Sequence, residues 1–122
     1  MADQELVEIL KQGVEVWNKR RSGHPKDILD FSKVDLSGAN LHEADLGLAN
    51  FIEADLIGVI LRGSDLSGTS LIGANLQGAD LRNANMSEAI LIGARIYRGE
   101  LDAVILKGAD IRDLEIMQDT GI

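Results

Sequence analysis

Residues 39–46 read Ala-Asn-Leu-His-Glu-Ala-Asp-Leu, so a small residue, an Asn or Asp and a Leu occur together twice, five residues apart. The same spacing continues in both directions along the chain. Every fifth residue from Phe31 to Ile116 is large and apolar, with no insertion or deletion in the series. We assign these residues to the core: Phe31, Leu36, Leu41, Leu46, Phe51, Leu56, Leu61, Leu66, Leu71, Leu76, Leu81, Met86, Leu91, Ile96, Leu101, Leu106, Ile111 and Ile116.

A second column of mostly small residues stands two positions before each large residue, and the position between the two columns is Asp or Asn in most repeats. A period of five is neither the 3.6 of a helix nor the 2 of a strand. Each pentapeptide therefore forms a short extended side followed by a corner. Since side chains alternate along an extended segment, the large and the small residue point the same way, which we take to be inward.

Four such sides close a coil of 20 residues, and successive coils stack about 4.8 Å apart through parallel pairing. Residues 29–118 make about 4.5 coils on this reading. Glycine recurs two positions after the large residue, as at Gly58 and Gly63. A type II turn needs a positive φ at its third position, where glycine has no steric penalty. The pattern predicts an all-β solenoid.

The chain resembles the pentapeptide repeat family, whose motif is A(D/N)LXX, over residues 29–118. The resemblance implies a right-handed quadrilateral β-helix, and the handedness comes from the resemblance alone. The N-terminal helix followed by a short repeat is similar to small cyanobacterial members. Ile60, Ile90, Arg95 and Glu100 stand where the motif has Asp or Asn. The side-chain bonds that Asp and Asn make to the backbone at the corners are not expected at these positions.

Residues 3–21 follow a helical period, with Leu6, Leu10 and Trp17 among the residues on one face. We expect one amphipathic helix with Asp3 as its N-cap, ended by residues 22–25. The helix would cover the open strand edge and apolar core of the first coil, which would otherwise pair with other chains. The chain then divides into a capping helix and linker at 1–25, a β-helix at 26–118 and a tail at 119–122.

The amino-acid composition limits the kinds of binding and catalytic site that the chain can form. The chain has 12 Lys and Arg against 20 Asp and Glu, a net charge of −8, and no Cys. Non-specific nucleic-acid binding needs clustered positive charge, and thiolate sites need Cys, so both are excluded. The Asp and Asn column could hold a divalent cation, but these residues more commonly bond the local backbone at turns. We expect no catalytic residues, no metal and no cofactor, and interpret the chain as non-enzymatic.

The sequence also bears on location. No apolar run is long enough to span a bilayer, and residues 1–5 lack a basic region followed by an apolar one. We therefore expect no membrane association and a cytoplasmic protein.

The outward positions of one side read Ser32, Ile52, Ile72, Ile92 and Arg112 along the stack. The three isoleucines, together with Tyr97, form our candidate interaction surface for an unidentified protein partner. The favoured function is a scaffold or interaction protein. The alternative is a DNA mimic that binds a type II topoisomerase (DNA gyrase), as the resemblance allows. Residues 29–118 carry 14 acidic and 7 basic residues, so the negative charge that mimicry requires is diluted.

The last half coil has no apolar layer above it. Ile111, Leu114, Ile116 and Met117 are predicted to form a weak homodimer contact, because an apolar end of this kind is self-complementary about a two-fold axis. The narrow cross-section of one coil limits the area that such a dimer buries. The competing interpretation folds the tail over this end, with Ile122 as the plug.

Overall fold

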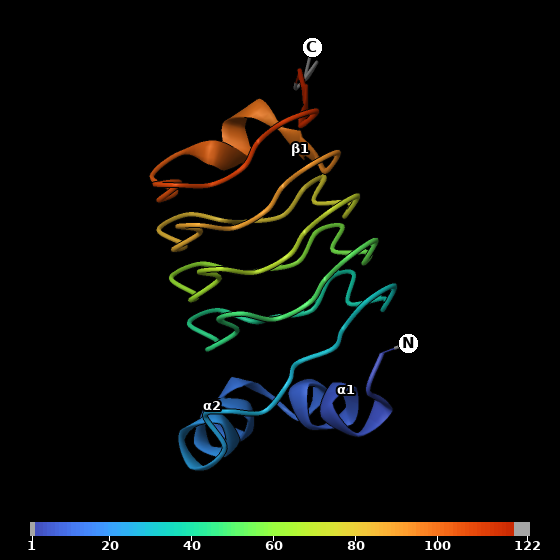
Figure 1. The fold of residues 1–122 in the computed structure, drawn as a ribbon, viewed down its shortest axis with the longest axis vertical. Helices are drawn as coiled ribbons and strands as arrows, with labels where there is room; N and C mark the ends of the chain where they lie inside the picture. The colour runs from blue at the N-terminus through green and yellow to red at the C-terminus, as the bar shows by residue number, and fades with distance from the viewer. Residues whose placement is uncertain (1, 119–122) are drawn as a thin grey trace.

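The computed structural model describes residues 2–118, apart from the side chains of residues 98 and 99. A stack of coils stands on a pair of helices (Figure 1). Regular elements are α1 (Gln4–Lys11), α2 (Val14–Gly23), β1 (Arg95–Tyr97), the 3-10 helix η1 (Arg98–Leu101) and β2 (Glu115–Met117). Across the described residues, neither helix has the length and apolar character needed to cross a membrane.

Parallel bridges join residues 20 positions apart, which sets the length of one coil. Asp30 pairs with Asn50, Asn50 with Ser70, and Ser70 with Ile90. The strands β1 and β2 continue the same register, with Arg95 opposite Glu115. Each side is too short to be more than a bridge at most positions. The chain is thus a β-helix-type solenoid in which each coil pairs with the coil before and the coil after it.

Each corner between Phe31 and Ala94 is closed by a tight turn. The backbone N–H of Val34 donates to the carbonyl of Phe31 at 3.2 Å, and the third residue of that turn, Lys33, has a φ of 58°. A positive φ at the third position is the type II geometry expected from the glycines. Several corners carry other residues in the same conformation: Lys33, Glu43, Leu48, Glu53, Asn83, Glu88, Ala103 and Asp113.

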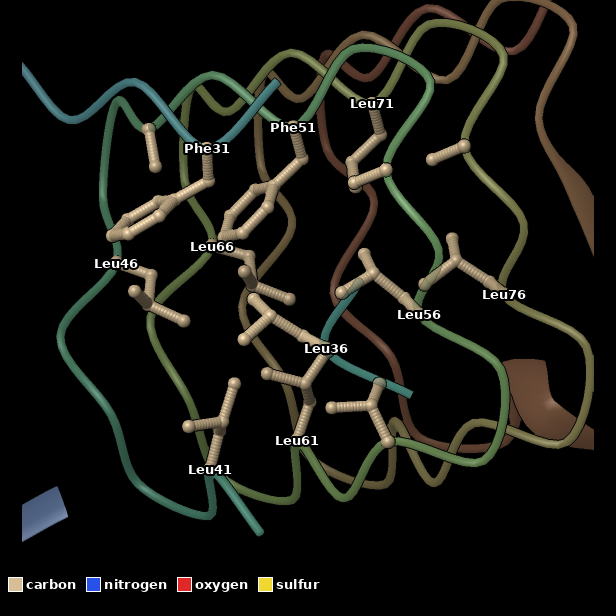
Figure 2. Packing of buried hydrophobic residues seen from close by; sticks show 14 of the residues in the cluster. Phe31, Leu36, Leu41, Leu46, Phe51, Leu56, Leu61, Leu66, Leu71 and Leu76 are labelled. Carbon is tan, nitrogen blue, oxygen red and sulfur yellow. The ribbon is translucent and has the colours of Figure 1, made fainter. Parts of the chain in front are cut away.

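The two inward columns form one continuous core. All of the large residues from Phe31 to Ile96 are buried. Figure 2 shows those from Phe31 to Leu76 projecting from the sides of the coils into the interior. Phe31 and Phe51 stack with ring centroids 5.4 Å apart. Two polar residues in the small column, Ser64 and Thr69, are buried as well, because their hydroxyls donate to the carbonyls of Leu61 and Leu66.

The core assignment is wrong at the C-terminal end. Leu101 and Leu106 are half-buried, whereas Ile111 and Ile116 expose 52% and 44% of their surface. These residues keep the pentapeptide register, but the described chain places no further coil over them. An inward direction buries a side chain only where another layer lies on both sides of it.

The single N-terminal helix is also wrong, because the chain forms α1 and α2. Gly13 separates them with a φ of 117°, a value that glycine adopts without strain. Asp3 caps α1 as predicted, since its side chain accepts from the backbone N–H groups of Glu5 and Leu6. The break lets α2 turn beneath the first coil, where Trp17 meets the ring of Phe31 at a centroid distance of 5.7 Å.

Candidate interaction surfaces

The Asp and Asn column is occupied by local hydrogen bonds. The backbone N–H of Ser37 donates to Oδ1 of Asp35 at 2.9 Å, and that of Ser87 donates to Oδ1 of Asn85 at 3.0 Å. The same bond from two residues ahead recurs at most Asp and Asn positions of the column, and it is the turn chemistry that the sequence indicated. Among the described residues, no group of three or more His, Asp or Glu is placed to hold a metal ion.

One carboxylate in this column carries two ion pairs. Oδ2 of Asp80 lies 2.8 Å from Nη2 of Arg82 and 3.0 Å from Nε of Arg62. The hydrogen bond from the Arg82 side chain, with smaller contributions from the Arg82 backbone and the charges of both arginines, lowers the pKa of Asp80 to about 2. A carboxylate with so low a pKa stays ionised at neutral pH, so Asp80 does not serve as a proton donor.

The side chains of Ile52, Ile72 and Ile92 lie at corresponding positions of successive coils, one position beyond buried residues of the core. All three are half-buried, as is Tyr97. We call Ile52, Ile72 and Ile92 the isoleucine stripe. The stripe offers a continuous apolar strip without charged side chains of its own, which suits a protein partner better than a polar ligand.

The C-terminal end combines apolar side chains with open backbone. Ile111 and Ile116 are exposed there, while Leu114 and Met117 are half-buried. β2 pairs on one side with β1. The residues predicted to fold back, 119–122, lie outside the described part of the chain.

A hollow of about 830 Å³ lies between the α1–α2 junction and the first coil. Its lining is mixed: Gln12, Glu15 and Asn18 from the helical part face Asn40 and His42 from the coil. The ring of His42 bonds Oδ1 of Asn40 at 3.0 Å. This arrangement holds no nucleophile with an adjacent base, so it does not indicate catalysis.

The two most exposed large apolar residues of the described chain were not predicted from the sequence. Ile28 exposes 87% of its surface and Leu48 exposes 82%. Leu48 occupies the third position of a corner turn. The sequence pattern predicts only the backbone conformation of that position and says nothing about its side chain. Ile28 lies between α2 and the first bridge at Asp30, ahead of the first repeat that fixes an inward or outward direction.

Comparison with family models identifies a match to "Pentapeptide repeats", with 8 copies over residues 30–68 and 69–108. A comparison with curated protein sequences found no match.

Among solved structures, the chain is similar to a pentapeptide repeat protein from the thylakoid lumen of Arabidopsis thaliana, with 27% identity over 75% of this chain and 67% of that one, and a TM-score of 0.40. It is also similar to Rfr23 from the cyanobacterium Cyanothece 51142, with 36% identity over 72% of this chain and 54% of that one, and a TM-score of 0.31. QnrB1, a plasmid-mediated fluoroquinolone resistance protein, matches with 20% identity over 77% of this chain and 48% of that one, and a TM-score of 0.41. The chain therefore spans about half the length of Rfr23 and of QnrB1.

Proposed function

Because the chain belongs to the pentapeptide repeat family, we propose that it is a non-enzymatic rod that presents its side faces to a protein partner. The observation that carries this proposal is the isoleucine stripe on a solenoid whose polar column is taken up by its own turns. A rigid repeat with an apolar strip along its side offers area for contact with another protein. We place its site of action in the cytoplasm as part of the same proposal, which fractionation of the native host tests.

We further propose that the solenoid is a right-handed quadrilateral β-helix of about 4.5 coils, in which residues 26–118 form one unit. The 20-residue spacing of the bridges and the four turns per coil support four sides. Residues 1–25 form the N-terminal unit of this proposal. In this proposal the N-terminal unit covers the first coil, which the contact of Trp17 with Phe31 supports.

The stripe is tested by a charge placed at its centre. Ile72→Lys leaves the buried columns untouched, so we expect unchanged folding and at least a tenfold loss in capture of any partner recovered with the wild-type protein. Circular dichroism and the unfolding midpoint report on folding, and quantitative pull-down from the native host reports on capture. Unfolding of the variant would show that the side chain of Ile72 belongs to the core.

Gln77→Lys is the matched control. Gln77 is half-buried and occupies the same pentapeptide position as Ile72, one corner further along the same coil. The Gln77→Lys substitution adds the same positive charge at a position outside the isoleucine stripe. Equal loss of capture in both variants would contradict a docking role for the stripe.

The exposed C-terminal end supports a weak homodimer. Ile111 and Ile116 expose apolar surface at an end that no described segment covers. Light scattering over a dilution series should show a concentration-dependent dimer in the wild type and a monomer for Ile116→Glu. A wild type that is monomeric at every concentration and unaffected by this substitution would contradict the dimer.

Mimicry of DNA is the alternative function, and the charges on the sides count against it. Arg62 and Arg82 neutralise Asp80, and Arg112 pairs with Asp110 at 2.7 Å. A duplex mimic needs an unbroken negative surface. We therefore expect no effect of the protein on supercoiling by DNA gyrase at stoichiometric amounts, and inhibition or protection would favour mimicry instead.

A further inference from the structure

A hollow of about 340 Å³ lies where the linker after α2 passes the first coil. The segment that follows α2 lines it with Arg21 and residues 25–29, which include Lys26, Asp27 and Ile28, and the coil lines it with Gly47 and Leu48. The isoleucine stripe contributes nothing to it. Its lining joins the two most exposed large apolar side chains of the described residues with basic groups.

Leu48 is held in a costly conformation at the rim of this hollow. Its φ of 64° is left-handed, a region that bulky side chains rarely adopt. Leu48 exposes 82% of its surface, so its side chain gains little from burial in return. A Cβ on Gly68 would lie 2.7 Å from Cδ2 of Leu48, so the leucine side chain rests over a residue that has none. The repeat imposes the same φ at the other described corners, so Leu48 is distinguished by a large apolar side chain that stays exposed there.

Arg21 lines the hollow with a positive charge that no described carboxylate pairs with. The residue exposes only 9% of its surface. Nη1 donates to the carbonyl of His24 at 3.1 Å, while Nε is buried without a hydrogen-bond partner. The nearby carboxylate of Asp27 is engaged elsewhere, 3.3 Å from Nη2 of Arg20. Within the described part of the chain, Arg21 forms no ion pair.

The charge at the hollow differs in sign from that of the whole molecule. The charged residues that line it are Arg21, Lys26 and Asp27, and the Asp27 carboxylate is paired with Arg20, whereas the whole chain has a net charge of −8. Positive charge is therefore concentrated beside an apolar rim at one end of an acidic protein. A partner that satisfies both features carries carboxylates next to aliphatic side chains.

We propose that this hollow docks an extended acidic peptide segment of another protein, with an aliphatic side chain between Ile28 and Leu48 and a carboxylate directed at Arg21 and Lys26. A membrane surface fits less well, because a nearly buried guanidinium inside a hollow is reached by an inserted side chain and not by a planar layer of headgroups. The proposal is independent of the stripe, since no stripe residue lines the hollow.

The test uses an acetylated, amidated tetrapeptide of alternating aspartate and leucine, titrated into the ¹⁵N-labelled full chain. We expect saturable shifts of the backbone amides of Lys26, Ile28 and Leu48. Peptides with asparagine in place of aspartate, or serine in place of leucine, should bind at least tenfold more weakly. Absence of shifts at millimolar peptide, or equal binding of the asparagine peptide, would overturn the proposal.

Two glycine variants separate binding from folding. Leu48→Gly removes the side chain and relieves the left-handed φ, so it should raise stability and weaken the peptide at least tenfold. Glu53→Gly relieves the same conformation at the next corner, where φ is 56°, and should leave the affinity unchanged. Lys26→Gln should weaken binding by several-fold. Equal affinity in Leu48→Gly and the wild type would contradict the site.

Two other occupants are outcomes of the same comparison. Co-sedimentation with phosphatidylserine vesicles that Leu48→Gly abolishes would replace the peptide by a membrane. Self-association in ultracentrifugation that Leu48→Gly abolishes would replace it by a second copy. Either result without peptide binding would overturn the assignment to a peptide. Neither result bears on the isoleucine stripe, which the Ile72→Lys variant tests separately.

Discussion

The third residue of the described corner turns adopts a left-handed φ, which is a conformation of high energy for residues other than glycine. Glycine fills this position at Gly58, Gly63 and Gly73, yet Glu53 adopts the same left-handed φ. A left-handed conformation costs an L-residue about 1–2 kcal/mol, and the repeat imposes it regardless of residue type. The turn geometry is therefore set by the stacking of coils, which overrides local preference.

Glu53→Gly should raise the free energy of unfolding by about 0.5–1 kcal/mol. The relief of the left-handed φ exceeds the entropy that the added freedom gives to the unfolded chain. Urea unfolding measures the change, with Glu53→Ala as the control that keeps the conformation and should change little. A destabilised glycine variant would mean that the Glu53 side chain makes a contact worth more than the strain.

Asp80 makes stability depend on pH. Its pKa falls from the usual 3.8 to about 2 in the folded chain, so its contribution is complete above about pH 5 and is lost as the pH falls through about 2. Asp80→Asn keeps the acceptor that the turn requires, as Asn85 shows, and removes only the charge. We expect it to cost about 1 kcal/mol at pH 7, allowing for solvent screening of a partly exposed pair, and only a small fraction of that near pH 2.

Urea unfolding at several pH values measures this difference. Asp55→Asn is the matched control, because Asp55 occupies the same turn position and forms no ion pair in residues 2–118. A pH-independent difference between Asp80→Asn and the wild type would show that the loss comes from the turn and not from the charge.

At the scale of elements, α2 takes the place of a missing coil. Nε1 of Trp17 donates to the carbonyl of Asp45 at 2.7 Å, and Nδ2 of Asn18 donates to the carbonyl of Glu43 at 2.9 Å. Oδ1 of Asn18 accepts from the backbone N–H of Asp45 at 2.8 Å. Side chains of the helix thus satisfy backbone groups that a preceding coil would otherwise bond, which protects the strand edge.

Asn18→Ala should lower the free energy of unfolding by about 1–3 kcal/mol, because it leaves a backbone donor and a backbone acceptor of the first coil without their partner. Lys19→Ala is the control on the same helix, with an exposed side chain and an expected change near zero. Thermal and urea unfolding compare the two variants. Equal stabilities would show that water replaces Asn18 without loss.

The helices also mark the limit of what the sequence could predict. The five-residue spacing predicted the coil length, the inward columns and the turns from Asp35 and Asn85, because one pattern repeats and each copy supports the others. The break at Gly13 lies in a segment without repeats, where Leu10 and Trp17 fit one continuous helix as well as two. Only the first coil, through Glu43 and Asp45, determines where α2 must lie.

For the candidate surfaces, the register predicted that Ile52 and Ile72 point outward, and the structure leaves both half-buried, because burial depends on neighbours above and below. The exposure of Ile116 and the conformation of Leu48 follow from where the stack ends and how a corner turns. Neither property belongs to a single pentapeptide, so neither could be predicted from one.

At the scale of the whole molecule, the core residues become less buried towards the C-terminal end of the stack. Leu76 is fully buried between coils, and Ile116 is exposed on the last one. Leu76→Ala should cost about 2–5 kcal/mol, as buried Leu to Ala substitutions do, whereas Ile116→Ala should cost well under about 1 kcal/mol. Urea unfolding at a dilution where the protein is monomeric measures both. Similar costs would indicate that the two ends are equally covered.

Pairing at a fixed interval of 20 residues also shapes the response to force. Each coil touches only its neighbours, so a chain pulled by its two ends should come apart one layer at a time, beginning at the uncovered end. Every released layer frees a strand of about 65 Å when extended. We expect a regular series of equal increases in length under force. The last step releases the layer that Trp17 anchors.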